Sequence, residues 1–305
     1  MASIQTNPSA MIALRTLKST TDSLAQVQNR ISTGYKVAEA SDNAAYWAIA
    51  TVMRSDNKAL GTVQDALGLG ASKVDITYTG LNSALDVVDE IKKRLVAARE
   101  AGIDRSKIQD EITELQRQLI GIGESSSFAG ENWLSVNSAS ASYSQIKTIV
   151  SSFTRTSAGV QIQTIPIDTA KTELFDAANQ SGILDSVFTT TGAGAVTVSV
   201  STLDVSNPAL DNTDIDDLIK AVDAKLQLVT TAASDIGATK KRVTLQMDFV
   251  DTLMDAIDRG VGTLVDADMS KESTRLQALQ TQQQLGIQAL SIANSSAQNI
   301  LALFK

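Results

Sequence analysis

The sequence contains no cysteine and no histidine, and these two absences exclude several classes of protein. Without cysteine there is no disulfide framework, no Cys/His zinc site and no thiol nucleophile. Without histidine there is no Ser-His-Asp triad and no haem held by an imidazole. Carboxylates, lysine, tyrosine and backbone groups are all that remain for chemistry. We therefore expect a protein that is not an enzyme and that holds no metal or cofactor.

Proline and aromatic residues are also scarce. The 305 residues include 3 prolines, and aromatic side chains make up 4% of the chain. Because the prolines are Pro8, Pro166 and Pro208, residues 9–165 and 209–305 contain no strong helix breaker. This distribution predicts long helices in both end segments and irregular structure between them.

Charge and hydropathy exclude two kinds of partner. The formal net charge of −8 argues against nucleic acid, because phosphate binding requires a basic face. The N-terminal residues lack the basic and apolar regions of a secretory signal peptide, so sequence rules alone indicate the cytoplasm. Gln and Asn interrupt the apolar C-terminal segment before about 18 apolar residues accumulate, so we expect no membrane insertion.

Two uninterrupted heptad patterns are the clearest signals in the chain. Apolar residues that recur every seven positions are typical of long helices packed as coiled coils. The first pattern predicts a helix over about residues 57–100, and the second a helix of about 45–50 residues in the C-terminal half. Neither helix can bury its apolar stripe alone, so the two halves must pack together. The predicted coiled-coil core consists of Leu60, Leu67, Val74, Leu81, Val88, Leu95, Val222, Val229, Ile236, Val243, Val250 and Ile257.

A shorter helix and a β-containing segment are expected between the two long helices. A helix should follow Ser106, which is spaced from Gln109 as in a capping box, and fold back as an antiparallel neighbour. Alternating apolar residues predict one strand over 160–167, interrupted near Pro166, and a second over 196–200. Some helix is expected near residues 169–179. The resulting fold class is mainly α, with long antiparallel coiled-coil helices from both chain ends and a small β-containing central insertion.

The two extreme ends carry apolar residues that a single chain has difficulty burying. An amphipathic helix is predicted over about residues 9–32, ending at Gly34, and no charged residue lies between Arg275 and Lys305. An uncharged helix with apolar residues on more than one face is either an ordinary core helix or part of an association surface. Terminal position and richness in amides favour association. The predicted self-association residues are Leu14, Leu17, Leu24, Val27, Ile31, Leu276, Leu285, Leu290, Ile300, Leu301 and Phe304.

Other candidate sites are weaker. The acidic run over 211–217 lacks the glycine and terminal glutamate of an EF-hand loop, so we interpret it as acids that favour the N-terminal end of the following helix. The Gly192-Ala193-Gly194 segment is followed by neither a third glycine nor a lysine, and it indicates a turn and not a phosphate loop.

Several segments resemble bacterial flagellins. Residues 29–50, NRISTGYKVAEASDNAAYWAIA, are similar to the signature segment of that family, and residues 265–272 and 299–305, VDADMSKE and NILALFK, are similar to its C-terminal signature. Residues 106–134 also match. The pair Tyr46-Trp47 replaces smaller residues of the family signature, as in flagellins of soil and plant-associated alphaproteobacteria.

The resemblance implies a subunit that polymerises into the helical flagellar filament for swimming motility. It implies terminal helices at 1–41 and 267–305 that form the filament core, a long-helix coiled-coil domain at 42–141 and 214–266, and a small outward-facing segment at 142–213. It also implies export without a cleaved signal peptide to an extracellular filament. The implied partners are further copies, other flagellins, the flagellar export apparatus, and the hook-junction and cap proteins.

The resemblance also locates altered receptor positions. Where an animal innate receptor reads an arginine and a leucine, this chain has Lys93 and Ala97, and the matching acid, Glu111, is retained. Two alternative functions stay open from sequence. One is a hook–filament junction protein, and the other is a secreted effector or translocator with a membrane-active C-terminal helix.

Overall fold

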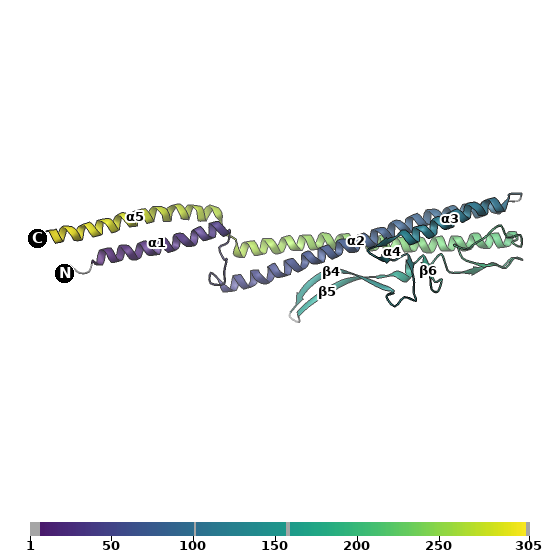
Figure 1. The fold of residues 1–305 in the computed structure, drawn as a ribbon, viewed down its shortest axis with the longest axis horizontal. Coiled ribbons are helices and arrows are strands. Elements are labelled where there is room, and N and C mark those ends of the chain that lie inside the picture. The colour runs from purple at the N-terminus through teal and green to yellow at the C-terminus, as the bar shows by residue number, and fades with distance from the viewer. Residues whose placement is uncertain (1–6, 101, 157–158, 303–305) are drawn as a thin grey trace. The chain divides into compact units, whose positions relative to one another are not determined.

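The computed structural model describes residues 7–100, 102–156 and 159–302, and the side chains as far as residue 295. The chain divides into two compact units, one formed by residues 1–58 and 254–305 and the other by residues 59–253. Five α-helices lie in the described part of the chain (Figure 1). They are α1 (Pro8–Thr33), α2 (Ala44–Ala98), α3 (Arg105–Ser125), α4 (Asn212–Val265) and α5 (Met269–Ala302).

The unit of residues 59–253 is built around the two heptad seams. The seven-residue rows on α2 and α4 are buried from Leu60 to Leu95 and from Val222 to Val250. Ile257, the last predicted core position, is half-buried and belongs to the other unit. α3 adds Ile112 and Leu119 to the buried set. The mainly α fold class predicted from the sequence is therefore confirmed.

Short strands occupy the segment between α3 and α4. They form two-stranded sheets only, among the residues that the structure describes. The strands are β1 (Ser127–Phe128), β2 (Glu131–Asn132), β3 (Ser135–Val136), β4 (Ile146–Thr156), β5 (Gly159–Asp168), β6 (Phe175–Asp176), β7 (Phe188–Thr189) and β8 (Thr197–Val198). β3 pairs with β6 in parallel, and the other three pairs, β1 with β2, β4 with β5, and β7 with β8, are antiparallel.

The structure corrects two local predictions in this unit. The capping box is wrong, because Asp104 is the N-cap of α3 and accepts a hydrogen bond from the Ser106 backbone N–H. β5 continues through Pro166, which pairs with Thr148. A proline is tolerated there because a two-stranded sheet leaves one side of each strand unpaired.

The remaining differences concern length. The helix expected near 169–179 is a single 3-10 turn, Thr169–Lys171, and the strand expected over 196–200 is only β8. α2 begins at Ala44 and not near residue 57, and α4 is 54 residues long.

The β4–β5 ribbon packs against α2 at a glycine. A Cβ atom at Gly70 would overlap the buried Ile149 side chain and come within 2.9 Å of its Cδ1 atom. Gly68, two residues earlier in α2, has no such neighbour within 4 Å. The contact between the ribbon and α2 therefore requires a glycine at position 70 but not at position 68.

This difference predicts opposite effects of two alanine substitutions. Gly68→Ala should stabilise the unit by about 0.5–1 kcal/mol, because alanine restricts the unfolded chain and favours helix. Gly70→Ala should destabilise it by about 1–3 kcal/mol, because Ile149 is packed and has no room to move. Thermal unfolding by circular dichroism should therefore give the order Gly68→Ala, parent, Gly70→Ala. The reverse order would show that the ribbon does not pack on α2 in this way.

The unit formed by residues 1–58 and 254–305 contains α1, α5 and the adjoining ends of α2 and α4. Gly34 ends α1 with a φ of 77°, a conformation that favours glycine, and its N–H donates to the Arg30 carbonyl. The segment after it pairs with the segment between α4 and α5 through an antiparallel bridge between Tyr35 and Asp266. Beside this bridge lies a small core of Val37, Ala50, Val261 and Val265.

Candidate self-association surface

α1 and α5 lie side by side and antiparallel (Figure 1). At one end of the pair, Asn7 Nδ2 donates a hydrogen bond to the Ala293 carbonyl at 2.9 Å. At the other end, Arg30 Nη1 lies 3.5 Å from Glu272 Oε1, and the Glu272 side chain is buried. The first contact joins the start of α1 to the later part of α5, and the second joins the end of α1 to the beginning of α5.

Some of the predicted self-association residues form the seam within this pair. Leu24 and Val27 of α1 are buried in the single chain. Four others are half-buried in it: Leu17, Ile31, Leu276 and Leu290. The pair therefore uses one face of each helix for its own packing.

Other apolar residues of the same helices remain exposed. Leu14 and Leu285 are each 58% exposed. The exposed set also includes Met11 and Ile12 on α1, and Ile287 and Ile292 on α5, with Ile292 at 68%. Met11 and Ile12 are absent from the predicted self-association residues, although their positions close to Leu14 in the sequence could have indicated them. The side chains of Ile300 and Leu301, and residue Phe304, lie outside the part that the structure describes.

Four exposed residues of α5 form a second seam. Ala278, Leu285, Ala289 and Ile292 are all exposed and follow one another at intervals of seven, four and three residues. This spacing places them on one helix face. We call these four residues the outward α5 stripe. The half-buried residues Leu276, Leu279 and Leu290 define a different face, which packs in the pair.

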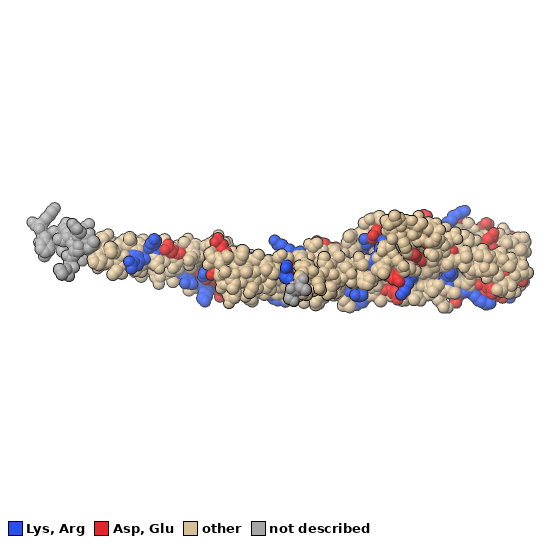
Figure 2. Space-filling view, turned by 90° about the horizontal axis from the view of Figure 1, so that it is seen from below, with Lys and Arg blue, Asp and Glu red and all other residues tan. Residues whose placement is uncertain are grey.

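Few charges accompany this surface. Arg275 lies three residues before Ala278, and the next charged residue is Lys305, so the part of the outward α5 stripe from Leu285 to Ile292 has no charged neighbour along its own helix. In Figure 2 the surface beside the grey end residues is mostly tan, with small blue and red groups. Apolar side chains in uncharged surroundings are removed from water at little electrostatic cost, and each one gains the free energy of apolar burial.

The altered receptor positions lie elsewhere, in the unit of residues 59–253. Lys93 is exposed and pairs with Asp89 at 2.9 Å and with Glu90 at 3.4 Å, whereas Ala97 is half-buried. Glu111 of α3 pairs with Arg94 of α2 at 2.9 Å.

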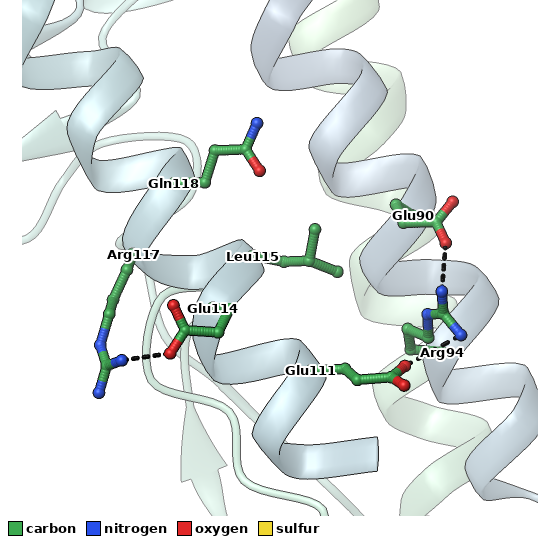
Figure 3. A pocket seen from close by; sticks show the side chains of 7 residues that line it. All are labelled: Glu90, Arg94, Glu111, Glu114, Leu115, Arg117 and Gln118. Atoms are coloured by element: carbon green, nitrogen blue, oxygen red, sulfur yellow. Dashed lines mark hydrogen bonds and ion pairs between the residues drawn. The ribbon is translucent and has the colours of Figure 1, made fainter. Parts of the chain in front are cut away.

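A groove of about 620 Å³ runs between α2 and α3 beside this ion pair. Figure 3 shows Arg94 there, held between Glu90 of its own helix and Glu111 across the groove. The carboxylate of Glu111 is therefore already engaged by a cation of the same chain.

The acidic run before α4 acts within the chain. Asp211 Oδ1 accepts a hydrogen bond from the Asp214 backbone N–H at 2.8 Å, in the first turn of the helix. The Thr190 side chain and the backbone N–H groups of Gly194 and Asp211 hydrogen-bond to Asp214 and lower its pKa to about 2. These contacts support the interpretation of the run as acids at a helix start.

Neither a metal-binding cluster nor a membrane-spanning helix is found in the part of the chain that the structure describes. No group of three or more His, Cys, Asp or Glu side chains within that part of the chain could hold a metal ion. No helix there combines the length and the apolar character needed to cross a bilayer.

Comparison with known proteins identifies the family. Residues 4–139 match the bacterial flagellin N-terminal helical region, and residues 219–304 match the bacterial flagellin C-terminal helical region. The chain is 49% identical to Flagellin C of Rhizobium meliloti strain 1021 and 44% identical to a flagellin of Brucella melitensis. Flagellin A of Rhizobium meliloti is 41% identical, and all three alignments cover the whole of both chains.

The chain therefore belongs to the bacterial flagellin family, and its relatives are of the alphaproteobacterial type. It is a structural subunit that polymerises into the flagellar filament, which is extracellular.

Proposed function

We propose that the subunit polymerises through the exposed apolar surface of the α1/α5 pair, with the outward α5 stripe as its centre. The observation that carries this proposal is the second seam of α5, where Leu285 and Ile292 stay exposed although the helix is already paired with α1. A helix with two apolar seams needs a second partner helix. In a head-to-tail polymer every copy supplies that partner to a neighbour.

The residues packed between α1 and α5 support the proposed self-association surface indirectly. Leu24 and Val27 hold α1 on α5 and so fix which faces of the two helices point away from the pair. The exposed Leu14 of α1 then extends the apolar surface beyond α5.

We further propose that different segments of the chain form different layers of the filament, as family membership supports. Residues 1–41 and 267–305 form the filament core, residues 42–141 and 214–266 form the surrounding coiled-coil layer, and residues 142–213 face outward. The subunit leaves the cell through the flagellar export apparatus without a cleaved signal peptide. It meets the hook-junction and cap proteins at the two ends of the filament, and it has no catalytic role.

The receptor positions carry a proposal of their own. We infer weak recognition by the animal innate receptor, because Lys93 and Ala97 stand at the altered positions. The pairing of Glu111 with Arg94 at 2.9 Å adds a competing partner for the retained acid. A reporter-cell dose–response with purified protein should be shifted to higher doses relative to a flagellin that carries arginine and leucine there. An equal response would contradict the inference.

Electron microscopy of the purified full chain under mild salting-out tests the main proposal. Long helical filaments are expected, and the pelleted fraction should rise above a critical concentration. Short closed rings, or protein that stays in solution at all concentrations, would contradict it. Intact-mass measurement of filament subunits tests the export proposal, because cleavage of a signal peptide would shorten the chain.

A further inference from the structure

The first turns of α2 carry an apolar face that stays exposed among the residues that the structure describes. Tyr46, Ile49 and Val52 follow one another at intervals of three residues and therefore share one side of the helix. They are 45%, 50% and 46% exposed, respectively. Ala45 and Ala48 are exposed too and extend the same side. We call these five residues the α2 face.

The fold of the unit uses only the border of this face. Ala50, four residues after Tyr46, is buried, and Met53, four residues after Ile49, packs against the small core that includes Val261 and Val265. Those contacts already hold the start of α2 in place. The apolar side chains of the α2 face are therefore additional to what the folded chain requires.

The α2 face is also uncharged. Residues 43–53 contain no charged side chain. The exposed apolar residues of α1, by contrast, are followed by the exposed cations Arg15 and Lys18. Exposed Leu245 of α4 has the exposed Arg242 three residues before it. Burial of such charges opposes tight apolar packing, so an uncharged face is the better match for another uncharged face.

The aromatic composition points to the same place. The chain has only 2 tryptophans and 4 tyrosines. Trp133 is buried in the core, whereas Trp47 and Tyr46 are both exposed at the start of α2. Tryptophan and tyrosine are enriched among the residues that dominate binding energy in protein interfaces. Of these two exposed aromatic residues, Tyr46 belongs to the α2 face, whereas Trp47 lies on the side of Thr51.

We propose that the α2 face of one subunit docks onto the outward α5 stripe of a second copy. The proposal rests on the self-association surface proposed above, and it identifies the α2 face as the surface of a second copy that packs against the outward α5 stripe. Both surfaces are apolar, exposed and free of charge within their own helix segments. The contact joins two different surfaces, so it leaves an unused copy of each and propagates head to tail.

A pair of charge variants tests the α2 face. Ile49→Asp should raise the critical concentration for polymerisation at least roughly tenfold, because the charge would be buried against an apolar stripe. Thr51→Asp is the matched control, since Thr51 is exposed on the opposite side of the same turn. It should polymerise like the parent chain. Circular dichroism of both free variants should be unchanged, because each substituted side chain is exposed.

Cross-linking identifies the partner surface. The chain has no cysteine, so Ile49→Cys and Leu285→Cys can be made as separate single-cysteine chains and mixed before polymerisation. A disulfide between the two chains is then necessarily intermolecular. Oxidised filaments of this mixture should yield the mixed dimer, and a mixture of Thr51→Cys with Leu285→Cys should not.

The outcomes separate this proposal from the one on which it rests. If the parent chain forms filaments but the mixed 49/285 dimer is absent, or if Ile49→Asp polymerises normally, the docking proposal is overturned and self-association stands. If neither the parent nor Thr51→Asp polymerises at any concentration, self-association itself fails, and the docking proposal fails with it.

Discussion

Replacement of Leu285 by aspartate is expected to abolish filament formation while the rest of the chain folds normally. Leu285 is 58% exposed in the single chain, so a charge is tolerated there before assembly. In the polymer the same side chain would be buried in an uncharged surface, and an unpaired buried charge costs several kcal/mol. The measurement is the pelleted fraction as a function of protein concentration, with circular dichroism of the free subunit alongside.

Two further variants make this test specific. Leu285→Met keeps the volume and apolar character of the side chain and should polymerise nearly normally. Leu290→Asp places the charge on a half-buried residue of the inner face, so it should lower the helicity of the free subunit as well as its assembly. Normal filaments from Leu285→Asp would show that the outward α5 stripe is not buried between subunits.

Removal of the Asp176 carboxylate is expected to have the second large effect, on stability. Asp176 is fully buried, and its Oδ1 accepts hydrogen bonds from the backbone N–H groups of Ser138 and Ala178, each at 3.0 Å. Its Oδ2 accepts from the Ser138 and Ser181 hydroxyls at 2.6 and 2.8 Å. Asp176→Ala leaves these donors without their acceptor and should cost about 2–4 kcal/mol.

Asp204 provides the matched control. Its Oδ1 accepts hydrogen bonds from the Ser206 N–H and hydroxyl, but the residue is exposed. Water can replace the carboxylate there, so Asp204→Ala should change the free energy of unfolding by only about 0.5 kcal/mol. Urea denaturation of both variants measures the difference. Equal changes in the unfolding free energy would show that burial of Asp176 does not increase the contribution of its hydrogen bonds to stability.

The same carboxylate should make stability depend on pH. Burial alone would raise the pKa of Asp176, but the hydrogen bonds from Ser138, Ala178 and Ser181 outweigh it and hold the pKa well below its usual range. A lowered pKa in the folded state adds stability above the unfolded-state value of about 3.9, and this stability is lost as the pH falls further. The gap in unfolding free energy between parent and Asp176→Ala should therefore narrow between about pH 5 and pH 2.

The long helices could be predicted because one property of the sequence determines them. An apolar residue every seven positions has no low-energy arrangement other than a helix packed on another helix, and the rows from Leu60 and Val222 are buried as that pattern requires. The start of α2 was missed although Met53, seven residues before Leu60, continues the row and packs against the small core. The exposed apolar residues of this start, such as Ile49, face away from the core.

The central strands were harder to predict for a local reason. Pro166 suggested an interruption, but its missing N–H costs nothing on the open side of a two-stranded ribbon. Ser106 suggested a cap, but Asp104 two residues earlier supplies a carboxylate oxygen to the same helix end.

The candidate surface was predictable as a region but not by residue. α5 has apolar side chains on more than one face, so spacing alone could not say which of Leu285 and Leu290 packs within the pair and which stays exposed. Only the position of α1 decides this, and it leaves Leu285 outside and Leu290 half-buried.

Thiol labelling of the outward α5 stripe tests the central claim most directly. In this cysteine-free chain, Leu285→Cys or Ile292→Cys provides a single reactive thiol on that stripe, and Ser206→Cys provides an exposed control in the other unit. The account predicts rapid maleimide labelling of both stripe positions in the free subunit. In filaments, labelling of the stripe should slow at least roughly tenfold relative to the Ser206→Cys control, because neighbouring copies exclude water and reagent there. Equal labelling rates in free subunit and filament would contradict the claim that other copies cover this surface.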